Sequence, residues 1–116
     1  LYKLHTQPEE LVNYTKLFEL GIYTDDVQSW KHWLELKQAG YRIILGNFNC
    51  SNSNLTSLNG SPTVVKGSFD CSNNKLTSLN GQPESIGKYF YVYGNNLKYE
   101  NLSSEIAKYK NRLILE

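Results

Sequence analysis

The chain has 116 residues, of which 40% are hydrophobic and 20% charged, and its formal net charge is +1. This length is that of one domain, so we interpret residues 1–116 as a single domain. A near-neutral charge argues against general binding to nucleic acids or membrane surfaces, which needs a basic excess. The sequence has no basic start followed by an apolar run and no apolar stretch of about 18 residues. It therefore predicts no signal peptide, no membrane segment and a cytoplasmic location.

The first forty residues predict two helices. Thr6 and Glu9 have the spacing of a capping box, and Gly21 is suited to end the helix that they begin. Asp25 is the expected cap of a second helix, which Gly40 ends. The short connection between them predicts an antiparallel pair, and we interpret residues 1–40 as an amino-terminal helical cap. The expected apolar stripes are Leu11, Tyr14, Leu17 and Phe18, and then Val27, Trp30, Trp33 and Leu34.

A repeat follows the predicted helices. Residues 48–62 and 69–83 are two copies of one pattern with an offset of 21 residues. A more divergent third copy continues at the same offset with Phe90, Val92, Asn95 and Leu97. One copy cannot bury its apolar residues alone, whereas stacked copies form a continuous core. The constant period, with no hairpin turn between copies, favours parallel strands over the alternative of an antiparallel meander.

The two cysteines, Cys50 and Cys71, occupy the same position in successive copies. A disulfide scaffold or a zinc site needs more ligands at closer spacing. We interpret both as small buried apolar side chains, and a disulfide between neighbouring copies is the alternative. Further inward contacts are expected from Leu55, Leu58 and Val65, and from Leu76, Leu79 and Ile86.

The repeat unit Phe-x-Cys-Ser-x-Asn-x-Leu-Thr-Ser-Leu-x-Gly-x-Pro resembles the leucine-rich repeat family, especially its short bacterial and bacteriophage forms. The resemblance covers residues ~41–102. It implies an α+β fold, in which about three repeats form a short solenoid with a parallel sheet between helical caps. It also implies that the asparagine position, occupied by Ser53, Asn74 and Asn95, binds backbone groups along the stack. Ser53 departs from the family pattern, and Asn52 or Asn54 is expected to compensate.

The residues that alternate with the inward Phe and Cys are expected to line the exposed side of the sheet. The first two copies place small polar groups there, whereas the third places three tyrosines. Tyrosine is typical of binding surfaces because it offers a large area and a polar tip at a small entropic cost. Capping of these tyrosines by the carboxy-terminal segment is the alternative. The columns are Asn47, Ser68 and Tyr89, then Asn49, Asp70 and Tyr91, and then Ser51, Ser72 and Tyr93.

Residues 103–116 are interpreted as a carboxy-terminal helical cap, starting near Ser104 with Ser103 or Asn101 before it. Residues 113–115 are either part of this helix or a short strand on the last repeat. The basic residues Lys108, Lys110 and Arg112 are interpreted as a solvated face.

No catalytic motif is present, so the sequence predicts no enzyme, no cofactor and no metal. We interpret the chain as a non-catalytic protein–protein interaction module, and its partner as a host or bacterial protein. The phage-type repeats suggest an inhibitor of a bacterial defence complex such as a CRISPR effector. The alternatives are a self-assembling accessory protein and a nucleic-acid-binding protein that uses lysines on one face. The predicted partner-binding residues are Tyr89, Tyr91, Tyr93, Asp70 and Asn49.

Overall fold

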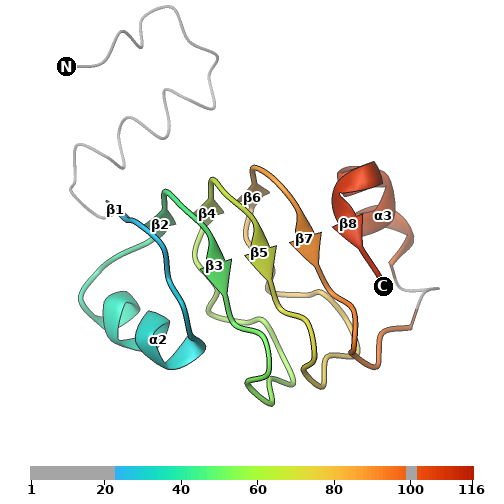
Figure 1. Cartoon of the computed structure of the whole chain (residues 1–116), viewed down its shortest axis with the longest axis horizontal. Helices are drawn as coiled ribbons and strands as arrows, with labels where there is room; N and C mark the ends of the chain where they lie inside the picture. Colours follow the sequence, from blue (N-terminus) through green and yellow to red (C-terminus); the bar gives the residue numbers. More distant parts are fainter. Residues whose placement is uncertain (1–22, 99–101) are drawn as a thin grey trace, which may run out of the picture.

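The chain forms two small parallel sheets of four strands each, accompanied by short helices, and is an α+β fold (Figure 1). The computed structural model describes residues 23–98 and 102–116. The first predicted helix, and its pairing with the second, lie outside the described residues. The first sheet has the order β1 (Tyr23–Thr24), β2 (Ile43–Ile44), β4 (Val64–Val65) and β6 (Ser85–Ile86). The second has the order β3 (Phe48–Asn49), β5 (Phe69–Asp70), β7 (Phe90–Tyr91) and β8 (Leu113–Ile114).

The strands of the three copies pair in parallel, one copy with the next. In the second sheet Phe48 pairs with Phe69, and Phe69 with Phe90. In the first sheet Ile43 pairs with Val64. Each of these offsets is 21 residues, which is the period of the sequence repeat. The prediction of parallel strands is confirmed, and the alternative of an antiparallel meander is wrong.

The first sheet adds to the single sheet expected from the sequence. Its strands pair at the same offset of 21 residues, Ile43 with Val64 and Val64 with Ser85. Glycines follow the strands where neighbouring copies approach closely. A Cβ atom on Gly67 would lie 2.5 Å from the carbonyl oxygen of Gly46, and one on Gly87 would overlap the carbonyl oxygen of Lys66. The repeated glycine therefore permits the copies to stack at this corner.

Parallel pairing begins before residue 41. Strand β1 pairs with β2, and Val27 forms a parallel bridge with Phe48, 21 residues further along the chain. The amide of Val27 donates to the carbonyl oxygen of Asn47 (2.9 Å), and the amide of Asn49 donates to that of Val27 (2.8 Å). The prediction that Val27 belongs to a helical stripe is therefore wrong, because this residue extends the second sheet.

Helix α2 (Trp30–Gln38) also begins later than predicted. Its cap is Ser29, whose Oγ accepts from the amide of His32 (3.0 Å), and not Asp25. Ser29 has the extended backbone that a capping residue needs, and its short side chain reaches the free amides of the first turn. Gly40 has a φ of +102° and follows the helix as predicted.

Helix α2 packs on the first repeat through its tryptophans. Trp33 is completely buried, its Nε1 donates to the carbonyl oxygen of Gly60 (2.8 Å), and its ring meets Phe48 edge-on with centroids 5.8 Å apart. Trp30 meets the same Phe48 ring edge-on at 6.2 Å. These contacts confirm the tryptophans as packing residues. Leu34 is 48% exposed, so its expected place on the buried stripe is wrong.

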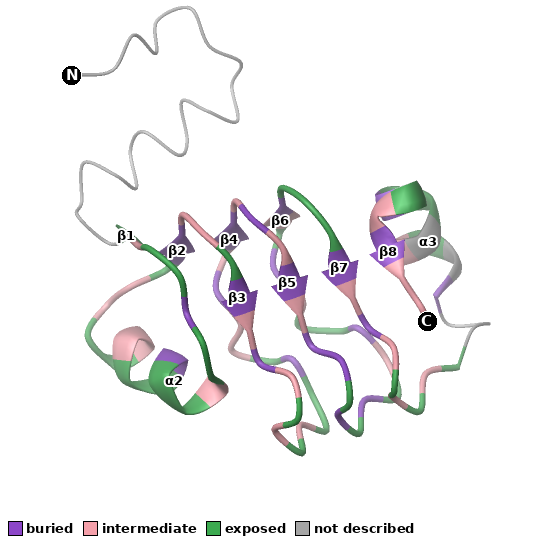
Figure 2. Cartoon of the chain, viewed as in Figure 1, coloured by how far each residue is buried: buried purple, intermediate pink, exposed green. Residues whose placement is uncertain are grey.

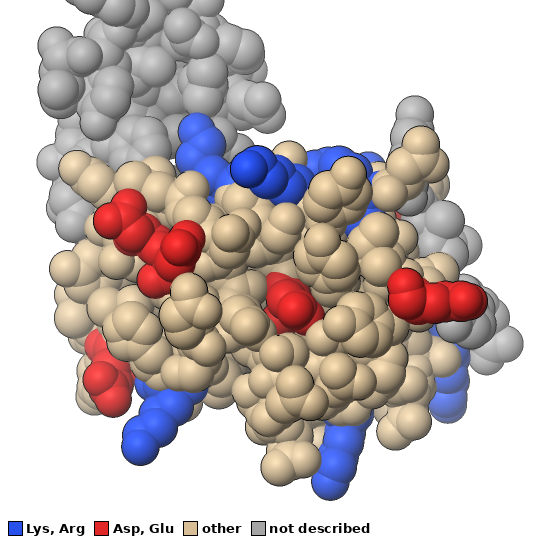
Figure 3. All heavy atoms as spheres, viewed as in Figure 1, with Lys and Arg blue, Asp and Glu red and all other residues tan. Residues whose placement is uncertain are grey.

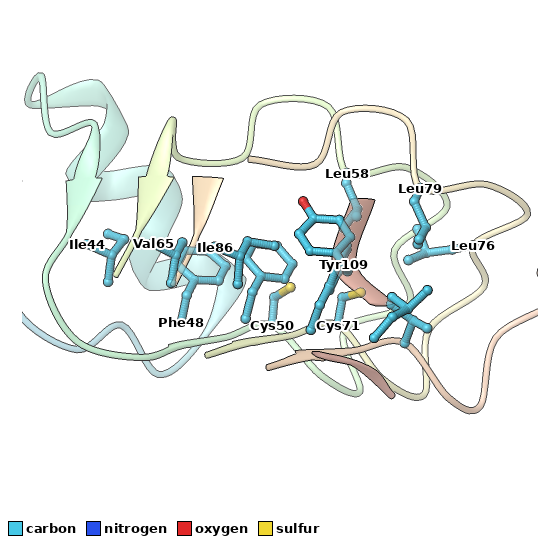
Figure 4. Close-up of a cluster of buried hydrophobic side chains, with 14 of the residues drawn as sticks. Ile44, Phe48, Cys50, Leu58, Val65, Cys71, Leu76, Leu79, Ile86 and Tyr109 are labelled. Atoms are coloured by element: carbon cyan, nitrogen blue, oxygen red, sulfur yellow. The ribbon is translucent and has the colours of Figure 1, made fainter. Parts of the chain in front are cut away.

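A column of aromatic rings runs through the core between the sheets. Phe48 and Phe69 stack with centroids 5.0 Å apart and an interplanar angle of 8°. Phe69 meets Phe90 edge-on at 5.5 Å, and Phe90 meets Tyr109 edge-on at 5.1 Å. Figure 2 shows that burial is concentrated on the strands of both sheets. Figure 4 shows other members of this core, among them Ile44, Val65, Ile86, Leu58, Leu76 and Leu79.

Cys50 and Cys71 are free and completely buried in this core, as predicted. Burial raises the pKa of both thiols well above the ordinary value, and the nearby Asp70 carboxylate raises it further. The thiols therefore stay protonated at neutral pH. Because the thiolate is the reactive form, both cysteines act as packing groups and not as nucleophiles.

Asn74 ties the first two repeats together. Its side chain is almost fully buried, with an exposure of 7%. The Oδ1 atom accepts from the amides of Ser53 (2.9 Å) and Leu55 (3.0 Å), and the Nδ2 atom donates to the carbonyl oxygens of Cys50 (3.0 Å) and Cys71 (2.9 Å). One amide side chain therefore satisfies backbone groups that the turns leave without partners.

Asn95 repeats this arrangement one copy further along. Its Oδ1 accepts from the amide of Leu76 (2.9 Å), and its Nδ2 donates to the carbonyl oxygen of Cys71 (3.1 Å). At the equivalent position of the first copy, the shorter Ser53 donates to the carbonyl oxygen of Ser51 (3.0 Å). The backbone interaction expected of this position is thus present at both asparagines.

The expected compensation by Asn52 or Asn54 does not occur among the hydrogen bonds of the described residues. Both residues instead adopt left-handed backbone conformations, with φ of +53° and +56°. Asparagine tolerates this conformation better than most residues, so these two shape the turn after β3.

The carboxy-terminal segment lies beside the last repeat as α3 (Ser103–Tyr109), a 3₁₀ turn (Lys110–Arg112) and β8 (Figure 1). Of the two alternatives for residues 113–115, the strand is correct at Leu113–Ile114, which pairs in parallel with β7. Tyr109 is buried, and its hydroxyl donates to Oε1 of Gln82 (2.7 Å). Across residues 23–98 and 102–116, no helix has the length and apolar character needed to cross a membrane.

Two basic side chains of this segment cover the open edge of the first sheet. The Arg112 guanidinium donates to the carbonyl oxygens of Ile86 and Lys88, and Lys108 Nζ lies 3.5 Å from that of Glu84. In the preceding copies, the equivalent carbonyl oxygens accept from backbone amides of the next copy. The interpretation of Arg112 as part of a solvated face is therefore wrong, whereas Lys108 is exposed as predicted. The two cationic side chains therefore donate to carbonyl oxygens that, in the preceding copies, accept from backbone amides of the next copy.

We expect Arg112→Met to lower the free energy of unfolding by about 1.5 kcal/mol, because it removes charge-assisted hydrogen bonds to the sheet edge. The methionine keeps an apolar stem over Tyr109, whose ring lies 5.5 Å from the Arg112 guanidinium carbon. Urea denaturation followed by circular dichroism measures the change.

Arg42→Met is the matched control. The Arg42 guanidinium also donates to two carbonyl oxygens, those of Lys37 and Tyr41, but it is exposed and its partners are close in sequence. Its loss should cost within about 0.5 kcal/mol. Equal effects of the two substitutions would contradict the special role of Arg112.

Candidate functional site

Three tyrosines project from one face of the second sheet, and we call Tyr89, Tyr91 and Tyr93 the tyrosine face. They alternate with Phe90 and Val92, which are buried in the core, as the period of a strand requires. Tyr89 is 48% exposed, and Tyr91 and Tyr93 are half-buried. The rings of Tyr89 and Tyr91 are 6.1 Å apart and tilted by 44°.

The carboxy-terminal segment meets the last repeat mainly at its edge and in its core. Strand β8 lies beside β7, where Tyr91 pairs with Ile114. Tyr109 packs against Phe90, which points inward. Tyr89 consequently remains open to solvent, and the tyrosine face presents one exposed side chain, Tyr89 at 48%, and two half-buried ones.

An open hollow of about 340 Å³ lies on the same face of the second sheet. Three of the predicted site residues, Asn49, Asp70 and Tyr91, lie in it together. Tyr89 contacts Tyr91 at its margin, whereas Tyr93 is not part of its lining. The complete lining is Gln28, Asn47, Phe48, Asn49, Ser68, Asp70 and Tyr91.

Asn49, Asp70 and Tyr91 form one row across three neighbouring strands. Asn49 pairs with Asp70, and Asp70 with Tyr91, so that each side chain lies one strand spacing from the next. Asp70 Oδ1 accepts from the amide (2.9 Å) and the hydroxyl (2.6 Å) of Ser72. Asn49 Oδ1 makes the same two contacts with Ser51, at 2.9 Å and 2.7 Å. The two side chains are therefore fixed by the same local turn.

This turn also corrects the expected third column. Ser72 was expected to face outward, but it is only 1% exposed, and its hydroxyl donates to Asp70 Oδ1. Ser51, at the equivalent position of the first copy, stays half-buried. Only Tyr93 of that column presents a large side chain.

The first column is a chain of hydrogen bonds between copies. Asp26 Oδ1 accepts from the amide of Asn47 (2.7 Å), Asn47 Oδ1 from that of Ser68 (2.8 Å), and Ser68 Oγ from that of Tyr89 (3.1 Å). The polar side chains of this column thus hold the stack together. Sequence reasoning missed Gln28 and Asp26 as members of this surface, although Asp26 stands 21 residues before Asn47.

The surface around the hollow is largely uncharged. Figure 3 shows that uncharged side chains cover most of this side, with an acidic group near its middle and basic groups along the edge above β4 and β6. Asp70 is the one charged residue in the lining of the hollow. In the part of the chain that the structure describes, no three His, Cys, Asp or Glu side chains are grouped to hold a metal.

Comparison with known protein families, with curated proteins and with solved structures found no match for this chain. The fold and the surface described above are therefore the basis of a functional assignment.

Proposed function

We propose that the chain is a protein-binding module without catalytic activity of its own, and that the tyrosine face and the adjoining hollow contact its partner. The observation that carries this proposal is the contrast within one sheet. The first two copies present Asn47, Asn49, Ser68 and Asp70, whereas the third presents large aromatic side chains at the equivalent positions. Tyr89 is the most exposed of these side chains, at 48%. The one aromatic contact of its ring, among the described residues, is with the ring of Tyr91.

We further propose that the scaffold is a short solenoid of the leucine-rich-repeat type. The parallel pairing at 21 residues and the two asparagines that bind backbone groups across copies support this assignment. In such a scaffold each copy adds one strand to a common surface, so substitutions on one face change recognition without disturbing the core. In this proposal the divergent third copy carries the residues that recognise the partner.

The resemblance to phage-type repeats supports a more specific proposal, in which the partner is a component of a bacterial defence complex. The net charge of +1 does not favour imitation of a nucleic acid, which needs a strong acidic excess. Blocking by contact with a protein surface fits the uncharged tyrosine face better. Coexpression with a CRISPR effector in a plasmid-interference assay tests this, and unchanged interference by every effector type would reject the proposal of an inhibitor.

We expect the triple substitution of Tyr89, Tyr91 and Tyr93 by serine to weaken partner binding at least about tenfold. Buried tyrosines at interfaces each contribute on the order of 2 kcal/mol when they act as hot spots. The measurement is affinity capture from bacterial lysate with the bound protein identified by mass spectrometry, followed by titration of that purified protein.

The control is a triple variant at exposed positions away from this face, Lys75→Ser, Thr77→Ser and Lys98→Ser. It should bind as the wild type does, and circular dichroism should show both variants folded. Equal affinity of the tyrosine variant and the wild type would remove the tyrosine face as the binding site. A self-associating accessory protein would instead recover only copies of itself.

A further inference from the structure

We propose that the hollow receives an arginine side chain of the partner protein, with Asp70 as the group that pairs with its guanidinium. This inference rests on the proposed function, because it names the chemistry that the same surface recognises. Its basis is the position of one carboxylate in the middle of an otherwise uncharged row.

The Asp70 carboxylate is oriented by hydrogen bonds at one of its two oxygen atoms. Its Oδ1 atom accepts both hydrogen bonds from Ser72, and these contacts fix the orientation of the side chain. Across the described residues, Oδ2 has no hydrogen-bond partner and the carboxylate has no ion pair. Asp70 is half-buried in a hollow that contains no basic residue. A carboxylate that is oriented, partly desolvated and unneutralised is suited to bind a cation from outside.

The neighbours of Asp70 favour a planar cation. Tyr91 stands next to Asp70 on the adjoining strand, and Tyr89 extends the aromatic surface with its ring 6.1 Å from that of Tyr91. A guanidinium stacks on an aromatic face while its N–H groups bind a carboxylate, whereas an ammonium is a compact and strongly hydrated charge. Asn49, on the other side of Asp70, adds a neutral polar wall. The row therefore offers both contacts that arginine makes best.

The chain itself provides a matched pair of variants. Asp70→Asn removes the charge and retains the oxygen that accepts from Ser72. This side chain is compatible with the fold, because Asn49 makes the same contacts with Ser51 in the preceding copy. The converse substitution, Asn49→Asp, adds a second carboxylate one strand away in the same turn geometry. The two variants change the charge of the hollow in opposite directions without removing a hydrogen bond.

The test uses a capped tri-arginine peptide as the probe, with tri-citrulline as its neutral analogue and tri-lysine as the alternative cation. Backbone amide signals of the full chain are followed by NMR during titration. We expect saturable shifts at Asn49, Ser72 and Tyr91 with tri-arginine, weaker shifts with tri-lysine and none with tri-citrulline. Asp70→Asn should weaken tri-arginine binding about tenfold or more, as expected for loss of a charged hydrogen bond, and Asn49→Asp should strengthen it.

Equal shifts with tri-citrulline, or equal affinity of Asp70→Asn and wild type, would overturn the inference. Equal binding of tri-lysine would overturn the assignment to arginine. These outcomes are distinguishable from failure of the proposed function. If Asp70→Asn retains the captured partner while the tyrosine variant loses it, the protein-binding role stands and the arginine site is rejected. If neither variant affects capture, the whole face is rejected.

Discussion

Replacing Phe69 with alanine should lower the free energy of unfolding by about 3–5 kcal/mol. Phe69 is completely buried in the middle of the aromatic column, stacked on Phe48 at 5.0 Å and edge-on to Phe90 at 5.5 Å. Alanine would leave a cavity between two copies that cannot close, because their strands are fixed in register by backbone pairing. A domain of this size has a total stability of about 5–15 kcal/mol, so the variant should be close to unfolding.

Urea denaturation monitored by circular dichroism and tryptophan fluorescence measures this loss, since Trp30 and Trp33 both contact Phe48. Phe69→Leu is the control, because it keeps most of the apolar volume and should cost about 1.5 kcal/mol. If the alanine variant lost less than this leucine variant, the aromatic column would not be the principal support of the stack.

Replacing Asn74 with alanine should lower the free energy of unfolding by about 3 kcal/mol. The substitution leaves the amides of Ser53 and Leu55 without their acceptor, and the carbonyl oxygens of Cys50 and Cys71 without a donor. An unsatisfied buried polar group costs about 1–3 kcal/mol, and water can reach only some of these groups. Thermal and urea denaturation of the same variant give two independent values of the change.

Two graded controls accompany this variant. Asn95→Ala removes a side chain that is half-buried and accepts from one amide, so it should cost roughly half as much. Ser53→Ala removes one hydrogen bond to the carbonyl oxygen of Ser51 and should cost less than about 1 kcal/mol. A loss that is the same at all three positions would show that the asparagines do not hold the copies together.

The repeat made the parallel register predictable. Phe48, Phe69 and Phe90 recur every 21 residues and alternate with polar residues, so their burial and mutual pairing follow from the pattern. The roles of Asn74 and Asn95 follow from the family resemblance in the same way. These features join residues at corresponding or neighbouring positions of successive copies, so the repeat itself makes them predictable.

The amino-terminal edge of the sheets was harder to predict because two signals overlap. Asp26 and Val27 continue the positions of Asn47 and Phe48 backwards by 21 residues, which is a signal for a further strand. The same stretch has the acidic residues and spacing of a helix start. The structure contains both features in succession. Val27 forms a parallel bridge with Phe48, and helix α2 begins after its cap at Ser29.

The carboxy-terminal edge could not be predicted from local sequence. The contacts of Arg112 with the carbonyl oxygens of Ile86 and Lys88 join residues more than twenty positions apart, in a segment without the repeat. The lining of the hollow could be predicted from the sequence only in part. Its row of Asn49, Asp70 and Tyr91 follows from the repeat, whereas Gln28 follows the unexpected β-bridge between Val27 and Phe48.

Site-specific photo-crosslinking tests the central proposal, that the face carrying Tyr89 and Tyr91 contacts a protein partner. A photoreactive phenylalanine analogue is placed at Tyr91 or, as the control, at the exposed Lys75, and irradiated in bacterial lysate. We predict that one protein crosslinks from position 91 but not from position 75, and that Tyr89→Ser with Asp70→Asn reduces its yield. No specific crosslink from position 91, or the same products from both positions, would contradict the proposal.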